Sequence, residues 1–372
     1  MNAIRVAIKK EPVFCVSAVL ALVSCLIVLP DAQYAGYIDL RVLALLYCLM
    51  VVVAGVEKAG LFERIATALL KKSKSGKALC IVLVMLCFFS SMVVTNDVAL
   101  ITFTPFAILV MGASGQQKFL PWVISLQTVA ANLGSMFTPV GNPQNLYLYT
   151  RYQFDVASFF AVTLPWTLLS FGILLALCLV LPIRKVEVNE TNAYSKLMQE
   201  QARQITTCFL LFCLCLGTVF HLMDWRLLLA AVVVVLALVN PKLLKGADFV
   251  LLATFVCFFV FAGNLARIPA LQTFLSQAMQ NRETLVSALV SQVISNVPAS
   301  VLLSGFTQQG KALLLGVNLG GLGTPIASLA SLISLKAYSK MEHAEIKRYL
   351  IIFSVLNFGL LVGLLLLSEL MK

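Results

Sequence analysis

The stretch NLGSMFTPVGNPQN, residues 132–145, holds three Asn, two Gly and two Pro between apolar segments that are long enough to cross a bilayer. Hydrocarbon offers no hydrogen-bond partner to an unwound backbone, and each unpaired group costs several kcal/mol. An interruption of this kind is tolerated only where it is buried in protein or lines a polar cavity. The stretch therefore predicts a broken membrane helix beside a polar site.

The composition of the whole chain supports a membrane setting. Of its 372 residues, 60% are hydrophobic and 12% are charged, whereas a soluble domain has about 25% charged residues. Apolar blocks recur throughout the sequence, and about 20 helical residues cover the hydrocarbon core. The expected fold is an all-α polytopic membrane protein, with spanning segments at residues 13–29, 40–56, 119–149, 156–181, 205–221, 226–240, 248–263, 311–338 and 349–367. The first segment has a basic flank and no small-residue cleavage site, so we expect it to stay as a signal anchor.

The distribution of basic residues predicts the orientation. With the N-terminus inside, 20 of the 27 Lys and Arg fall in cytoplasmic connections and 7 fall on the other side. The net charge of +11 is thus a topology signal, and no nucleic-acid partner is expected. The predicted location is the bacterial inner membrane, with a cytoplasmic N-terminus and a periplasmic C-terminus. All ten cysteines fall in apolar segments and no CxxC pair occurs, so we expect packing residues, no metal site and no cofactor.

The opening stretch has a second copy. NLGGLGTPIAS, residues 318–328, matches it at an offset of 186 residues in five of eleven positions, and upstream VVTNDVAL (93–100) and VISNVPAS (293–300) share a hydroxyl residue followed by Asn at an offset of 200. An extra segment, 205–221, inverts everything that follows it. The pattern predicts an inverted-topology repeat, as in many secondary transporters. Its parts are a first repeat at 1–182, a cytoplasmic linker at 183–204, a connecting transmembrane helix at 205–225 and a second repeat at 226–372.

Two further apolar pieces, 78–111 and 284–306, predict re-entrant hairpins. The arms of the second are 10 and 11 residues, about 15 Å each, which is half the hydrocarbon thickness. The first has longer arms that could, in isolation, cross twice. Within the breaks, Thr138-Pro139 and Thr324-Pro325 are expected to be the N-cap and first residue of each restarted helix.

Hairpin tips and helix breaks are expected to converge on one small-ion site. Amides and hydroxyls supply donors and acceptors, and free helix ends supply dipoles. The candidate residues are Thr95, Asn96, Asp97, Asn132, Gly134, Thr138, Asn142, Ser295, Asn296, Asn318, Gly320 and Thr324, with a possible Na⁺ near Asn96, Asp97 and Asn296. Asp97 either binds a coupling H⁺ or Na⁺ or caps the second hairpin arm. The amphipathic stretches 61–77 and 268–280 predict interfacial helices.

The hairpin tips resemble those of the ion transporter superfamily. TNDVALITFTP (95–105) and SNVPASVLL (295–303) are nearest to its arsenite/antimonite permease and citrate-transporter branch, and the whole chain looks like a bacterial inner-membrane permease of this type. The resemblance implies alternating access coupled to H⁺ or Na⁺. Symporters of the superfamily contact a substrate carboxylate and sodium with Ser-Asn-Thr tips, which implicates Thr95, Asn96, Ser295 and Asn296. The third tip positions here are Asp97 and Val297, so dicarboxylate recognition is not carried over.

Other functional classes lack their motifs. GxxxxGK[ST], HExxH and a Ser/His/Asp arrangement do not occur, so neither ATP-driven transport by this chain nor an enzyme is expected. The leading hypothesis is a secondary transporter for a small ion, namely an anion, an organic acid or a metalloid oxyanion. The predicted midplane has no Arg or Lys, which favours a monovalent anion, a neutral metalloid species or a cation. A Na⁺/H⁺ antiporter and a channel-like protein stay open, as does a homodimer in the lipid bilayer.

Overall fold

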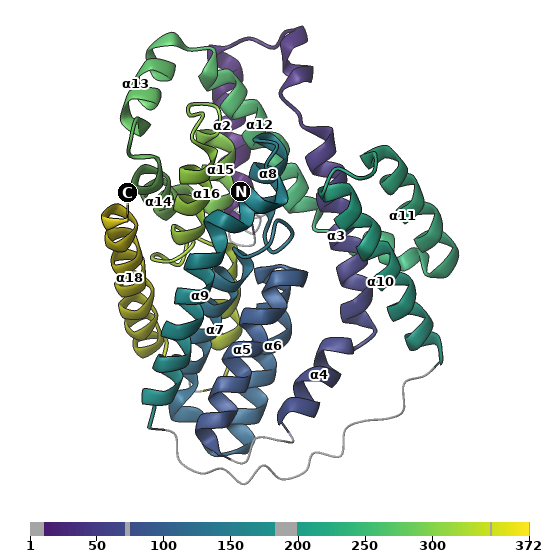
Figure 1. Cartoon of the computed structure of the whole chain (residues 1–372), viewed down its shortest axis with the longest axis vertical. Helices are drawn as coiled ribbons and strands as arrows, with labels where there is room; N and C mark the ends of the chain where they lie inside the picture. Colours follow the sequence, from purple (N-terminus) through teal and green to yellow (C-terminus); the bar gives the residue numbers. More distant parts are fainter. Residues whose placement is uncertain (1–10, 71–74, 183–198, 343, 372) are drawn as a thin grey trace.

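The structure is a computed structural model that describes residues 11–70, 75–182, 199–342 and 344–371, and every element in these ranges is helical (Figure 1). The predicted all-α class is confirmed. Six helices of the described residues are long and apolar enough to cross a membrane. They are α3 (Leu40–Lys58), α5 (Gly76–Val94), α9 (Val156–Val180), α10 (Gln199–Val219), α12 (Phe249–Ala266) and α18 (Ile346–Leu370).

Two of the predicted spans are interrupted helices. The span at 119–149 consists of α7 (Leu120–Ser135) and α8 (Pro143–Arg151), which follow the short η2 (Gln117–Phe119). The span at 311–338 consists of α16 (Gly310–Leu319) and α17 (Leu329–Ser339). The non-helical connections fall where the sequence clusters Gly, Pro and Asn. We refer to residues 136–142 and 320–328 as the first and second break.

The two predicted hairpins are helix pairs of unequal length. The first consists of α5 and α6 (Asn96–Ala113), and the second of α14 (Glu283–Ile294) and α15 (Asn296–Leu303). The arms of the second pair have 12 and 8 residues, about 18 and 12 Å at helical rise, too short to cross hydrocarbon of about 30 Å. By length alone, α5 could cross. The pairs lie toward opposite ends of the molecule, α5 and α6 low and α14 and α15 high in Figure 1.

The remaining helices surround these pairs. They are α2 (Pro12–Ile27), η1 (Ala32–Gly36), α4 (Leu61–Leu70), α11 (Trp225–Val239), η3 (Pro241–Lys245) and α13 (Pro269–Met279). The amphipathic α4 and α13 lie at opposite ends in Figure 1, and α10 and α11 lie beside α3. Of the predicted linker 183–204, residues 183–198 lie outside the described residues, and the rest already belongs to α10. Residues 71–74 of the predicted interfacial stretch 61–77 also lie outside them.

Side-chain packing divides the interior into two hydrophobic cores. One is built mainly by α5, α6, α7, α17 and α18, and the other by α3, α8, α10, α12, α15 and α16. Each interrupted helix therefore contributes one half to each core. Its break lies where the two cores meet, which places unwound backbone inside the protein and away from lipid.

Candidate functional site

The tips of both hairpins have the same unusual backbone. Thr95 between α5 and α6 has φ 79° and ψ 152°, and Ser295 between α14 and α15 has φ 74° and ψ 153°. This region is ordinarily accessible only to glycine, and occupying it costs about 1–3 kcal/mol per residue. Such strain persists only where surrounding contacts impose it, and it is often found at functional sites. The two tips are therefore shaped by their neighbours in the same way.

Each tip is held by the break that follows it in the chain. The backbone N–H of Asn96 donates to the Gly141 carbonyl at 3.2 Å, and that of Asn296 donates to the Ala327 carbonyl at 2.9 Å. These N–H groups begin α6 and α15, so they would otherwise lack an acceptor within their own helix. The contact pairs a donor left over at a helix start with an acceptor released by an unwound segment.

Threonine hydroxyls tie each break to a hairpin arm. The Thr138 hydroxyl donates to the Met92 carbonyl, and the Thr324 hydroxyl donates to the Gln292 carbonyl at 3.0 Å. The acceptors are 200 residues apart and the donors 186 apart, the same two offsets that relate the sequence motifs. Thr138 and Thr324 therefore position the breaks against the hairpin arms and do not form part of the central cluster described below.

The predicted helix restarts at Pro139 and Pro325 are wrong. α8 begins at Pro143, where the Asn142 side chain accepts the Asn145 N–H at 2.8 Å. α17 begins at Leu329, where the Ser328 hydroxyl accepts the Ala330 N–H at 3.2 Å. The threonine hydroxyls that were expected to cap these helices are occupied by the hairpin arms, so each break runs on to the next side chain that can cap.

An asparagine cluster, comprising Asn96, Asn132, Asn142, Asn145, Asn318 and Ser328, lies where tips and breaks meet. Asn132 makes three of the contacts in this cluster. Its Oδ1 accepts from Asn96 Nδ2 at 3.1 Å and from the Ser328 hydroxyl at 2.9 Å, and its Nδ2 donates to the Gly321 carbonyl at 3.2 Å. One side chain of the first interrupted helix thus joins the first tip to the second break.

Asn318 has the corresponding position on the other side of the asparagine cluster. Its Oδ1 accepts from Asn142 Nδ2 at 3.1 Å, and its Nδ2 donates to Asn145 Oδ1 at 2.7 Å. Asn318 is 2% exposed and Asn132 is 3% exposed. The two breaks, 186 residues apart in sequence, are therefore joined by neutral amide contacts deep in the protein.

The remaining predicted residues lie around this cluster. Gly134 and Gly320 allow helices to touch, because a Cβ would lie 2.2 Å from the Phe88 carbonyl at Gly134 and 2.8 Å from the Ala288 Cα at Gly320. Asn296 is adjacent to the cluster, since its Nδ2 would lie 2.8 Å from a Cβ at Gly321. The Ser295 hydroxyl donates to the Ala327 carbonyl at 3.3 Å. Two predicted residues, Thr95 and Asp97, face a cavity instead.

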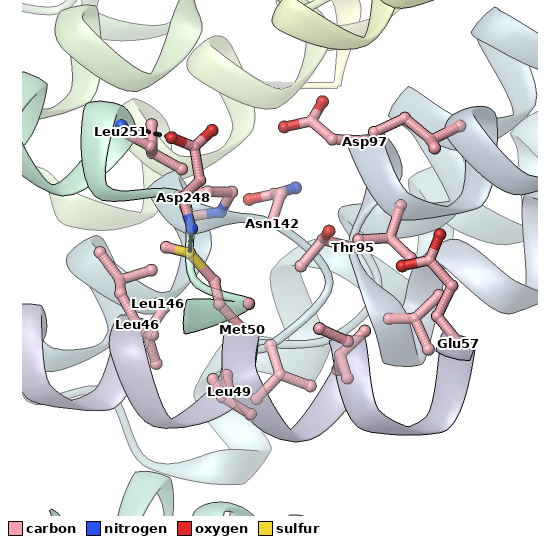
Figure 2. A pocket seen from close by; sticks show the side chains of 18 residues that line it. Leu46, Leu49, Met50, Glu57, Thr95, Asp97, Asn142, Leu146, Asp248 and Leu251 are labelled. Atoms are coloured by element: carbon pink, nitrogen blue, oxygen red, sulfur yellow. Dashed lines mark hydrogen bonds between the residues drawn. The ribbon is translucent and has the colours of Figure 1, made fainter. Parts of the chain in front are cut away.

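That cavity, the acidic pocket, reaches the first tip and the first break (Figure 2). It has a volume of about 210 Å³, enough for several water molecules or a small ion. Its polar lining includes Thr95, Asp97 and Asn142, together with Glu57 at the end of α3 and Asp248 before α12. One oxygen of the Asp97 carboxylate is buried without a hydrogen-bond partner among the described residues.

The carboxylates of Asp97 and Asp248 face each other across the acidic pocket, with the Asn142 amide near both (Figure 2). Asp248 caps α12 through the Leu251 N–H at 2.9 Å. Asp97 lies in the first turn of α6, where the helix dipole favours a carboxylate. The lining residues that the structure describes include three carboxyl groups and neither Lys nor Arg. Carboxylate and amide oxygens suit H⁺ or a hard cation, although no three acidic, His or Cys side chains of the described residues group as a metal site.

A second cavity of about 380 Å³ lies at the opposite end of α3. Its lining includes Asp39, which caps α3, as well as Tyr147 and Arg151 of α8 and Ser304 after α15. The Tyr147 and Ser304 hydroxyls are 2.7 Å apart. Unlike the acidic pocket, this cavity contains an arginine. The second cavity is lined by the residues just before α3 and by the end of α12. The acidic pocket is lined by the end of α3 and by the residues just before α12.

Sequence reasoning missed Glu57, Asp248 and Ser328. Glu57 resembles an interfacial residue beside Lys58, and Asp248 resembles an ordinary helix cap before an apolar run. An Asp before an apolar run does signal a helix start. It does not signal that the helix starts at the wall of a cavity, because this depends on packing between residues about 150 positions apart.

A polytopic helical protein whose helices break at a buried polar cluster has the architecture of a membrane transporter. The comparisons with known proteins agree, because the citrate transporter family profile matches residues 6–309, and the chain belongs to that family. The family resemblance inferred from the two tips is thereby confirmed.

Several relatives extend over most of the chain. It is 32% identical over 314 residues to an uncharacterised transporter of Methanocaldococcus jannaschii, covering 84% of each protein. It is 29% identical over 308 residues to the inner membrane protein YbiR of Escherichia coli K12, covering 82% of this chain and 81% of that one. The chain is also 35% identical over 151 residues to the silicon efflux transporter LSI3 of Oryza sativa subsp. japonica. This match covers 40% of this chain and 30% of the rice protein. The protein is a multi-pass membrane transporter.

Proposed function

We propose that the protein is a secondary active transporter that moves a small ion or weak acid across the bacterial inner membrane by alternating access, driven by H⁺ or Na⁺. The observation that carries this proposal is the matched pair of tips and breaks around the asparagine cluster. Interrupted helices supply free carbonyls and N–H groups to a substrate site in many transporters. Here both interruptions and both tips reach one buried cluster.

The matched contacts support an inverted repeat. In this proposal α2–α9 within residues 1–182 form the first repeat and α11–α18 within 226–372 form the second. The linker at 183–204 and the connecting helix at 205–225, which corresponds to α10, join them. An odd number of crossings between the repeats gives them opposite orientations, with the N-terminus cytoplasmic and the C-terminus periplasmic. The opposite placement of the two hairpins in Figure 1 supports this arrangement.

In this proposal amide side chains bind the substrate and a carboxylate binds the coupling ion. The side chains of Asn96, Asn132, Asn142 and Asn318 would recognise the substrate, because an amide can donate and accept without carrying charge. Asp97, with an unpartnered oxygen facing the acidic pocket of the described structure, would carry the coupling H⁺ or Na⁺. The acidic pocket would be the access route on the side where it opens.

The charges favour an uncharged or singly charged substrate. Citrate would bring several negative charges toward Asp97 and Asp248, with no basic residue in the described lining of the pocket. Silicic acid, suggested by the name of the rice relative, and arsenous acid, suggested by the permease branch, are small weak acids that are neutral near pH 7. Their hydroxyl groups could exchange hydrogen bonds with the asparagine amides. A small metalloid acid is therefore the substrate class that the site supports best.

A Na⁺/H⁺ antiporter is the second candidate function. The acidic pocket favours it, since a carboxylate that faces several other oxygen ligands can bind H⁺ and Na⁺ in competition. A channel-like protein with the same fold is less favoured, because the asparagine cluster fills the junction with side chains that hydrogen-bond one another.

Transport assays on the purified full-length chain in proteoliposomes test the proposal. Uptake of isotopically labelled arsenite and silicic acid is measured under an imposed pH gradient or Na⁺ gradient. A carrier gives saturable uptake, and preloaded unlabelled substrate accelerates exchange, whereas a channel shows no such exchange. Na⁺ or Li⁺ movement against a pH gradient without either metalloid would select the antiporter. Absence of gradient-driven flux of all four species would contradict the proposal.

A further inference from the structure

A second group of polar side chains extends from the asparagine cluster along the interface of α7, α17 and α18. We call it the hydroxyl seam. Its members are Ser125 and Thr128 of α7, Ser331 and Ser334 of α17 and Tyr349 of α18. All five side chains are 0% exposed. Buried hydroxyls normally have a hydrogen-bond partner, so their contacts can be followed one by one.

The seam is continuous with the asparagine cluster. On α7, Ser125, Thr128 and Asn132 are spaced three and four residues apart, so they share one face of the helix. α17 packs against α7 in the opposite direction: Ser328 bonds to Asn132 at 2.9 Å, and farther along Ser334 lies 2.6 Å from Thr128. The stretch of α7 from Asn132 to Ser125 is about 10 Å long at 1.5 Å per residue.

The far end of the seam lies where the chain turns into α18. Tyr349, in the first turn of that helix, stacks on Tyr338 with ring centroids 4.8 Å apart and an interplanar angle of 18°. The Tyr338 hydroxyl accepts the backbone N–H of Glu345 at 3.3 Å. Glu345 is exposed. The seam thus extends from the centre of the protein to a surface turn.

The hydroxyls of the seam are not fully satisfied by donors and acceptors of the described protein. Thr128 and Ser334 each lie 2.8 Å from a carbonyl of their own helix, so two hydroxyl hydrogens serve three close contacts. The Tyr349 phenol lies beside both of them but meets hydrogen-bond geometry with neither. The hydroxyls of Ser125, Ser331 and Tyr349 have no partner within the part of the chain that the structure describes. Three orphan hydroxyls beside a hydroxyl pair can be satisfied by water, which makes 2–4 hydrogen bonds in such sites.

At three of the five seam positions the corresponding residue of the other repeat is apolar, whereas Ser125 corresponds to Lys311 and Ser331 to Asn145. At an offset of 186, Thr128 corresponds to Leu314 on α16, and Ser334 corresponds to Leu148 on α8. α18 begins 190 residues after α9, so Tyr349 corresponds to Phe159. Leu148, Leu314 and Phe159 are also 0% exposed. The fold therefore fills the positions that correspond to Thr128, Ser334 and Tyr349 with buried hydrocarbon, so packing at these three positions does not require a hydroxyl.

We propose that the hydroxyl seam binds a file of water molecules that connects the asparagine cluster with the surface turn at Tyr338 and Glu345. Each orphan hydroxyl would donate to or accept from water, and the rotating Thr128–Ser334 pair would bridge successive molecules. The use of this file rests on the proposed function: in a proton-coupled carrier it is a path for the proton separate from the acidic pocket. The presence of the water does not depend on transport.

Hydroxyl-radical footprinting by synchrotron radiolysis tests this inference on the full-length protein in lipid nanodiscs. Radicals form from water in place, so a buried aromatic ring is modified only when bound water touches it. Tyr349 and Phe159 are equally buried and react at comparable intrinsic rates. We expect Tyr349 to be modified several-fold faster than Phe159. The double variant T128V/S334A should lower the Tyr349 rate to that of Phe159, whereas T254V should not change it. Thr254 is the matched control, because it is buried and donates to the carbonyl of Val250 in its own helix.

Two results would overturn the water file. One is a Tyr349 rate no greater than that of Phe159 in the unmodified protein, a comparison that needs no variant to fold. The other is an unchanged Tyr349 rate in T128V/S334A with an unchanged melting temperature. Neither result bears on transport, because the measurement uses no substrate and no gradient, so a failure of the proposed function is recognised separately in proteoliposomes.

Discussion

At the first hairpin tip Thr95 precedes Asn96 and Asp97, whereas at the second tip Ser295 precedes Asn296 and Val297. The backbone conformations agree within a few degrees, and the same kinds of contact hold both tips. The third side chain differs in charge. The comparison separates the structure of the junction from its charge. The same backbone shape, Asn amides and Thr–carbonyl hydrogen bonds build the junction at both tips. An ionisable side chain is present at the first tip only.

A second difference points the same way. The interface of α7 with α17 contains the Thr128–Ser334 hydroxyl pair, whereas leucines occupy the two corresponding positions on α16 and α8. The first tip lines the acidic pocket and α7 contributes to the hydroxyl seam, whereas the second tip and α16 contribute no described residue to either. The asymmetry therefore lies between the two tips and between α7 and α16, although Asp248, Ser331, Ser334 and Tyr349 come from the second half. The predictions below test this division, from the largest expected effect to the smallest.

Replacing Asp97 by Asn should abolish ion-coupled transport. The variant keeps the size of the side chain and removes its charge, so neither H⁺ nor Na⁺ can be exchanged there. Gradient-driven uptake in proteoliposomes should fall to the level of empty vesicles. D155N is the control: it also removes a carboxylate at a helix start, but Asp155 caps α9 through the Ser158 N–H at 2.8 Å and does not line the acidic pocket, so we expect folding and coupling to persist because Asn caps helices as well as Asp does. Unchanged coupling in D97N would mean that Asp97 only stabilises the first turn of α6. The two tips would then not differ in function.

Alanine at Gly134 should destabilise the protein by about 3 kcal/mol or more, because the new Cβ would lie 2.2 Å from a backbone carbonyl and a helix must move. G320A should cost less, about 1–3 kcal/mol, since its nearest contact is 2.8 Å. Gly172 has open space around it, and in the interior of α9 its replacement should be neutral or stabilise by about 0.5–1 kcal/mol. Denaturant unfolding of the three variants checks the order G134A, G320A, G172A. Equal stability of G134A and G172A would contradict the close approach of α5 and α7.

Removing the helix caps should give similar losses on both sides. N142A and S328A each remove the side chain that caps a restarted helix, at about 0.5–2 kcal/mol. N142A should be the larger of the two, because the Asn142 amide also donates to both Asn318 and Ser135, whereas the Ser328 hydroxyl also donates to Asn132 alone. The melting temperatures of the two variants in detergent measure the difference. A greater loss in S328A than in N142A would contradict the contacts described for the first break.

Acidification should weaken only one of two side-chain contacts that lie at corresponding loops outside the membrane core. Asp31 before η1 pairs with Arg267 at 2.7 Å, and this bond holds the pKa of Asp31 below its usual value. Asn240 before η3 pairs with the uncharged Gln204 at 3.2 Å. A lowered pKa means that the Asp31 contribution is complete above the ordinary aspartate value of about 4 and is lost as the pH falls through the lowered value. Melting temperatures of the wild type and D31N should therefore differ slightly at pH 7 and converge as the pH falls below the lowered pKa of Asp31. A difference that grows on acidification would contradict the ion pair.

Much of the fold could be predicted from local composition. A cluster of Gly, Pro and Asn within an apolar run has few alternatives in lipid, so the breaks at 136–142 and 320–328 follow from the sequence, as do Asn132 and Asn318 as polar residues at them. Their hydrogen-bond partners could not be predicted, because Asn132 bonds to Ser328 and Asn318 to Asn145 across more than 170 positions.

The errors arose where one side chain had two plausible partners. Thr138 and Thr324 precede proline as helix caps do, and only the position of the hairpin arms decides that their hydroxyls bond to Met92 and Gln292. Asp248 does cap its helix, and its second position in a cavity wall depends on α3 and α6. Local rules identify such residues, but tertiary packing determines what else they contact.

The central claim is that two halves of opposite orientation form one site, and cysteine accessibility tests it most directly. Gln117 and Gln308 are matched probes, since both are exposed and each lies between a hairpin and the interrupted helix that follows it. Q117C and Q308C are treated in intact cells with a membrane-impermeant maleimide and again after permeabilisation. The inverted arrangement predicts that Q308C reacts in intact cells and that Q117C reacts only after permeabilisation. Reaction of both variants from the same side of the membrane would contradict the account.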